Sequence, residues 1–285
     1  MTNSTTHTLE LPGATLTYEV HGAGSGTGEP PLLMIGAPMD AGGFTALAER
    51  FPDRMVVTYD PRGVGRSPRR DGLTAARPEE HAKDLHRLIS ELGGGAADVF
   101  GSSGGAVNGL ALVSRHPAAV RTLVAHEPPL AAGLPDREAV LDVTEDIHNT
   151  YEREGRGRAM AKFIAFTGLR GPLPPDFPDQ TRDPADFGLE AEDDGARDHP
   201  LLGPHMIWAP RYQPDYDSLR QASTRLVVAG GGDSVGTFPH RAALALAQSL
   251  DTQLVTFPSH HAGFTSQGDP DAFAAALRDV LTGSA

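Results

Sequence analysis

Two serines stand side by side between glycines in the stretch VFGSSGGAVNG, residues 99–109. The pattern Gly-x-Ser-x-Gly places its serine on a sharp turn from strand to helix, and Ser103 has the required glycine two residues away on either side. Centring the pattern on Ser102 would put Phe100 where a small residue is needed. Ser103 is therefore the predicted nucleophile, and attack of its hydroxyl on a carbonyl carbon is the predicted chemistry.

A serine hydroxyl is a weak nucleophile, so a base must accept its proton and a third group must orient that base. The segment TQLVTFPSHHAGF, residues 252–264, carries two histidines after an apolar run. His261 is followed by small residues that leave room for its ring to reach over a sheet edge, which makes it the predicted base. His260 is the alternative.

Two carboxylates are candidates for the orienting acid. Asp233 follows the apolar run 224–232, and Glu127 closes the run 120–127. Both runs read as parallel strands, whose carboxyl ends form the edge where open α/β sheets assemble their sites. Either side chain can accept the second ring N–H of His261, so the residues alone leave both open.

The elements that must position these side chains alternate along the chain. An antiparallel pair of strands is predicted over 7–13 and 14–22. Near-continuous apolar runs then predict strands buried on both faces of a parallel sheet, and helical patterns lie between them. These strands are expected at 31–36, 54–60, 97–102, 120–127, 224–232 and 252–259, and helices at 77–93, 104–117, 238–250 and 269–283.

The alternation is interrupted from about residue 131 to 218. Helical patches over 137–166 are followed by a stretch rich in Pro and Asp, 171–200, in which no buried strand is visible. We therefore predict a core domain made of residues 1–130 and 219–285, with a helical cap formed by the insertion 131–218.

Composition narrows the class of partner. The formal charge of −13 and the lack of a Lys/Arg cluster argue against nucleic acid and favour a small, neutral or apolar substrate. The chain has no cysteine, and its histidines show no metal-ligand spacing, so neither a metal nor a cofactor is expected. With no apolar run long enough to cross a membrane, we expect a cytoplasmic monomer or homodimer.

Three motifs taken together resemble the α/β-hydrolase superfamily. GSSGG, residues 101–105, matches its nucleophile elbow, HHAGF, residues 260–264, its histidine loop, and YDPRGVGRS, residues 59–67, the turn after its fourth strand. The resemblance implies an α/β-hydrolase fold, with a mostly parallel eight-stranded sheet flanked by helices and a variable cap. Most members carry the acid after the seventh strand, which favours Asp233; a minority carry it after the sixth, where Glu127 stands.

The resemblance also implies an oxyanion hole. One donor is the backbone N–H of Gly104, and the other is that of Ala37 in the GAP turn, since Pro38 has no N–H. Ile35 replaces the histidine that usually supports this turn. Four apolar side chains near these segments or in the insertion are candidates for the substrate pocket: Met39, Met206, Trp208 and Tyr212.

A serine, a histidine and a carboxylate indicate acyl transfer, and the leading hypothesis is hydrolysis of a small carboxylic ester or lactone through an acyl-enzyme. A carbon–carbon bond hydrolase or a cofactor-free perhydrolase would use the same residues. A ligand receptor that has lost turnover is the alternative from another class, although a receptor has no need to keep all these groups together.

Overall fold

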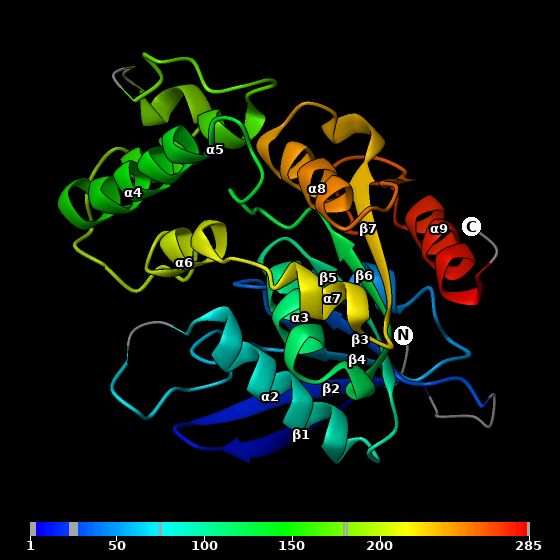
Figure 1. The fold of residues 1–285 in the computed structure, drawn as a ribbon. Coiled ribbons are helices and arrows are strands. Elements are labelled where there is room, and N and C mark those ends of the chain that lie inside the picture. Colours follow the sequence, from blue (N-terminus) through cyan, green and yellow to red (C-terminus); the bar gives the residue numbers. More distant parts are fainter. Residues whose placement is uncertain (1–3, 23–27, 74–75, 179, 181, 284–285) are drawn as a thin grey trace.

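An eight-stranded sheet with one antiparallel end organises the chain (Figure 1). The computed structural model describes residues 4–22, 28–73, 76–178, 180 and 182–283. The strand order is β1-β2-β4-β3-β5-β6-β7-β8; β1, β2 and β4 pair antiparallel, and all later pairs are parallel. The strands are β1 Ser4–Leu11, β2 Ala14–His21, β3 Leu32–Ile35, β4 Val56–Tyr59, β5 Ala97–Ser102, β6 Val120–His126, β7 Arg225–Gly231 and β8 Val255–Phe257.

Helices cover both faces of this sheet, which explains why the central strands are mostly apolar. On one face lie α2 Pro78–Glu91, α3 Gly104–Arg115, α7 Tyr216–Gln221 and α8 Phe238–Ser249, whose buried side chains share a core with β3, β5 and β6. On the other lie η1 Ala41–Phe44, α1 Thr45–Ala48 and α9 Pro270–Thr282, packed around Phe100 and Phe257. A short turn, η2 Pro117–Ala119, leads into β6.

The expected strands and the four expected helices are all present, with ends that coincide or differ by at most three residues. The eight-stranded, mostly parallel sheet flanked by helices confirms the predicted fold class. Parallel strands of this kind place their carboxyl ends along one edge, and the turns that follow β5, β6 and β7 carry Ser103, Glu127 and Asp233.

The segment between β6 and β7 forms no strand in its described residues. It contains α4 Arg137–Glu154, α5 Arg156–Gly168, η3 Pro184–Phe187 and α6 His205–Arg211, and its apolar side chains form a third core that includes Phe238 of α8. Figure 1 shows α4 and α5 next to each other at the upper left, with α6 below them. Helix α7 crosses the expected boundary at 218 and packs on α3. The outermost residues of the predicted core, 1–3 and 284–285, lie outside the described chain.

Candidate active site

Ser103 lies on a strained turn between β5 and α3. Its φ of 56° and ψ of −127° fall outside the regions that side-chain-bearing residues prefer. The turn also needs glycines: a Cβ on Gly105 would stand 2.1 Å from the carbonyl oxygen of Ile35, and one on Gly101 would stand 2.9 Å from Cα of Ala106. The strand, the strain and the small neighbours are those that the elbow pattern predicts.

The ring of His261 is hydrogen-bonded to Glu127. The distance from His261 Nδ1 to Glu127 Oε2 is 2.6 Å, and the other carboxylate oxygen, Oε1, accepts a 2.8 Å hydrogen bond from the N–H of Gly231. Glu127 is fully buried, whereas 40% of the His261 side chain is exposed. Like Ser103, Glu127 has a positive φ, 47°, which turns its side chain off the end of β6 toward the histidine loop.

The charge of Glu127 determines which ring nitrogen of His261 carries the hydrogen. Burial alone would raise the pKa of Glu127, but the hydrogen bond and charge of His261, together with His126 and the N–H of Gly231, lower it to about 2. The carboxylate is therefore ionised and can only accept, so Nδ1 of His261 must carry the hydrogen. The lone pair of the neutral ring is then on Nε2, which is the atom that a general base uses.

The lowered pKa of Glu127 predicts a pH-dependent contribution to stability. Its pKa in the folded protein, about 2, lies below the ordinary value of 4.5, so the contribution is present above the ordinary pKa and is lost as the pH falls toward 2. Lowering the pH from 6 to 3 should therefore narrow the gap in unfolding free energy between wild type and Glu127→Gln by about 2 kcal/mol. Urea denaturation at both pH values measures this gap; a gap that stays constant would contradict the assignment.

Asp233 occupies a different place. Its backbone N–H donates to the carbonyl of Ser259 at 2.9 Å, and its own carbonyl accepts from Arg170. Its exposed carboxylate makes no hydrogen bond or ion pair with any residue that the structure describes. The structure thus brings Glu127, the alternative acid, to His261 and leaves Asp233, the favoured one, apart from that ring.

The two predicted oxyanion donors lie next to each other. A Cβ on Gly104 would stand 2.3 Å from the carbonyl oxygen of Ala37, so the GAP turn and the start of α3 are in close contact. Because the first N–H groups of a helix have no acceptor within it, the N–H of Gly104 is available for a ligand. The ring of His205, from α6, packs on the same spot: its Cε1 and Nε2 would each be 2.7 Å from that Cβ.

Ser103 and His261 line one cavity of about 390 Å³, which also contains Asp233 and His260. No hydrogen bond links the Ser103 hydroxyl to His261 in the described chain; such bonds often tighten only in the substrate complex. The rest of the wall is mainly apolar and comes from the insertion and α8, with Phe163, Phe166, Leu201, Met206 and Phe238 as its larger side chains. A volume of this size with few polar groups suits a small organic molecule.

Of the four predicted pocket residues, Met206 lines this cavity, and the other three are not among the described residues that do. Met39 folds over Gly43 of the η1 turn. Trp208 stacks under the guanidinium of Arg77, 4.2 Å from Cζ to the ring centroid, and Tyr212 is 93% buried in the core beneath α3. Their expected role in substrate binding gains no support from where they lie.

Two histidines that were not predicted as site residues lie near the site. The fully buried ring of His126 is 6.1 Å from that of His261, and burial lowers its pKa to about 3. His205 lines the cavity, and burial lowers its pKa to about 4 against an opposing hydrogen bond with the carbonyl of Ala37. In the sequence, the position of His126 at the end of a strand is the one indication that either histidine lies near the site.

Within the described ranges, His, Asp and Glu side chains nowhere gather in threes with the spacing of a metal site. No helix described there combines the length and apolar character needed to span a lipid bilayer.

Comparison with known proteins agrees with this fold. A model of the alpha/beta hydrolase fold family matches residues 30–264. The chain is 32% identical to an uncharacterised hydrolase, YraK, of Bacillus subtilis over 280 residues, which cover 96% of this chain and 95% of the relative.

Solved structures of similar shape include a thermophilic esterase from Thermogutta terrifontis, 25% identical with a TM-score of 0.65 over 99% of this chain and 98% of that one. An enol-lactonase from Burkholderia xenovorans, 18% identical with a TM-score of 0.66 over 97% and 100%, shares the fold. With the family model matching most of its length, this chain belongs to the alpha/beta hydrolase fold family.

Proposed function

We propose that the protein is a serine hydrolase that cleaves a carboxylic ester or lactone with an apolar acyl part through an acyl-enzyme. The observation that carries the proposal is the 2.6 Å hydrogen bond from Nδ1 of His261, which lines the same cavity as Ser103, to the buried carboxylate of Glu127. A nucleophile, a base in the correct tautomer and a fixed anion are the groups that acyl transfer needs.

The reaction follows from these groups. Nε2 of His261 takes the hydroxyl proton of Ser103 as Oγ attacks the carbonyl carbon, and Glu127 stabilises the resulting imidazolium. The tetrahedral intermediate then expels the alcohol oxygen, which receives that proton from His261. Water repeats the sequence on the acyl-enzyme, releasing the acid and restoring the free serine.

The negative charge that develops on the carbonyl oxygen needs donors already in place. The N–H groups of Ala37 and Gly104 are proposed for this role. Gly104 follows Ser103 in the chain, and the segment of Ala37 is in contact with Gly104. Loss of one such donor typically slows an enzyme about a hundredfold or more. The apolar wall of the cavity favours a hydrocarbon acyl group over a charged one.

Labelling with a fluorophosphonate probe and turnover of a substrate panel test the proposal. We expect one probe per chain to react, and we expect hydrolysis of p-nitrophenyl butanoate or of simple lactones. A folded protein that stays unlabelled would be a receptor, and one that turns over only vinylogous diketones would be a carbon–carbon bond hydrolase. Either result would overturn the proposal.

A further inference from the structure

The turn of residues 36–38, which follows β3, carries the proposed oxyanion donor Ala37. Its own strand gives the turn no polar support, because Ile35, the last residue of β3, is buried in the apolar core. Pro38 has no N–H, so the peptide group between Ala37 and Pro38 has one hydrogen-bonding atom, the carbonyl oxygen of Ala37. A partner of this oxygen would therefore fix the orientation of the turn.

The chain just after the turn is anchored to the loop that follows β4. The N–H of Ala41 donates to Oδ1 of the buried Asp60 at 3.1 Å. The other carboxylate oxygen, Oδ2, accepts from the N–H of Arg66 at 2.8 Å. Asp60 thus joins the two segments, and residue 41 is fixed on the side of β4.

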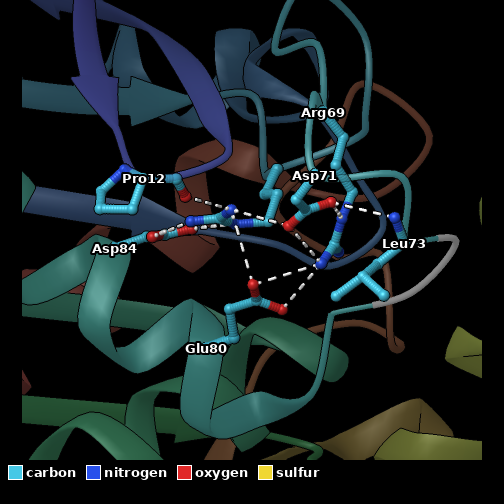
Figure 2. A network of polar contacts seen from close by, with 7 residues as sticks. Pro12, Arg69, Asp71, Leu73, Glu80 and Asp84 are labelled. Carbon is cyan, nitrogen blue, oxygen red and sulfur yellow. Dashed lines mark hydrogen bonds and ion pairs between the residues drawn. The ribbon is translucent and has the colours of Figure 1, made fainter.

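Two arginines immobilise this loop in turn. Arg62 donates to both carboxylate oxygens of Asp84 on α2, at 2.8 and 2.6 Å. Figure 2 shows Arg69 held between Asp71 and Glu80, with distances of 2.6 Å to the former and 3.2 Å to the latter. The loop is therefore a rigid support, but in the described chain no group of this network donates to the carbonyl at residue 37.

The carbonyl of Ala37 finds its partner in the insertion. It accepts a hydrogen bond from the ring of His205, the first residue of α6. The two groups meet beside Gly104, where a Cβ would stand 2.3 Å from the carbonyl oxygen and 2.7 Å from Nε2 of the ring. Because burial lowers the pKa of His205 to about 4, the ring is neutral at pH 7 and has a single N–H, which this hydrogen bond uses.

The position of His205 is itself fixed by the packing of α6. The carbonyl of Leu202, three residues earlier, accepts a 2.9 Å hydrogen bond from Nδ1 of His148 on α4. The next residue, Met206, is buried in the core of the insertion. The imidazole is therefore presented to the turn by a helix that is held on both sides of it.

We propose that His205 is a positioning residue for the oxyanion hole, and that its hydrogen bond to the carbonyl of Ala37 orients the turn so that the N–H of Ala37 faces the substrate oxygen. The inference rests on the proposed function and deepens it. The donor belongs to the insertion and the acceptor to the sheet domain, so the oxyanion hole is complete when α6 lies against the nucleophile turn. The effect belongs to the transition state, in which the substrate oxygen becomes negative, and not to substrate binding.

Replacing His205 by phenylalanine keeps a ring and removes the donor. Acylation and deacylation both pass through a negatively charged intermediate, so we expect kcat for p-nitrophenyl butanoate to fall roughly 10- to 100-fold while KM changes by less than about threefold. Inhibition by 1,1,1-trifluorohexan-2-one, whose adduct with Ser103 carries an oxyanion, should weaken by a similar factor. Hexan-2-ol, which forms no such adduct, should bind as tightly as it does to wild type.

Two further variants separate the hydrogen bond from packing. His205→Gln keeps an N–H donor and should recover kcat to within about fivefold of wild type. Arg211→Gln, on the same helix, removes an ion pair with Glu145 of α4 and should leave kcat unchanged. If His205→Phe does not fold, His205→Leu replaces it.

Three results would overturn the inference and leave the serine hydrolase intact. They are a rise in KM at unchanged kcat, an unchanged affinity for the trifluoromethyl ketone, and a glutamine variant as slow as the phenylalanine variant. Each would mean that His205 only fills the wall of the cavity. A wild-type protein that hydrolyses no ester or lactone would overturn the proposed function and the inference together.

Discussion

Replacing Ser103 by alanine is expected to reduce ester hydrolysis by roughly 10⁴- to 10⁶-fold and to abolish fluorophosphonate labelling. The effect is large because no other group can form the acyl-enzyme, while His261, Glu127 and the oxyanion donors stay in place but have nothing to activate. The measurements are kcat/KM for p-nitrophenyl butanoate and intact-mass detection of the probe adduct.

The neighbouring serine provides the matched control. Ser102 is 98% buried at the end of β5, and its hydroxyl lies 3.5 Å from Nδ1 of His126, so it does not reach the cavity. Ser102→Ala should keep the label and most of the activity. If Ser102→Ala were the inactive variant, the elbow would be centred one residue earlier than proposed.

The order and type of the sheet elements could be predicted because local pattern and burial agree there. Nearly all residues of β3, β5 and β6 are buried on both faces, so each strand is a near-continuous apolar run in the sequence. The short helices α1 and α6 had no such signal. The first spans four residues, and the second contains Pro210, which a helical pattern does not favour.

The nucleophile and the base were predicted as residues because glycines and small neighbours mark their turns. The sequence did not decide which carboxylate bonds to His261. The ends of β6 and β7 place Glu127 and Asp233 at the same edge of the sheet, and only the backbone conformation at each residue determines which side chain points to the ring. The positive φ of Glu127 turns its side chain toward the ring, and such a conformation is uncommon for a residue other than glycine. No pattern in the sequence predicts this positive φ.

The residues that line the cavity were harder to predict than the catalytic residues. Trp208 and Tyr212 follow His205 within a few residues, but each turns to a different neighbour: Arg77 for the tryptophan, the core beneath α3 for the tyrosine. Which side of a short helix faces a cavity depends on packing between segments far apart in the chain. Hydrophobic character alone therefore could not assign them.

Changing Glu127 to glutamine should reduce kcat/KM by roughly 10⁴-fold, whereas Asp233→Asn should cost less than about tenfold. Both substitutions keep the size of the side chain and remove one charge, so the pair compares the two candidate positions of the acid. The structure favours the first because His261 Nδ1 is bonded to Glu127, while the Asp233 carboxylate has no described partner. A larger loss of kcat/KM for Asp233→Asn than for Glu127→Gln would show that Asp233, after β7, is the acid.

The reason for so large a loss lies in the second contact of Glu127. The N–H of Gly231 donates to Oε1, so a glutamine would keep its oxygen there and turn its NH₂ group toward His261. Nδ1 must then accept a hydrogen bond, and the ring proton moves to Nε2. In that tautomer the imidazole has no lone pair to offer Ser103, and no fixed anion stabilises the imidazolium once it forms, so the base fails although every atom stays close to its original place.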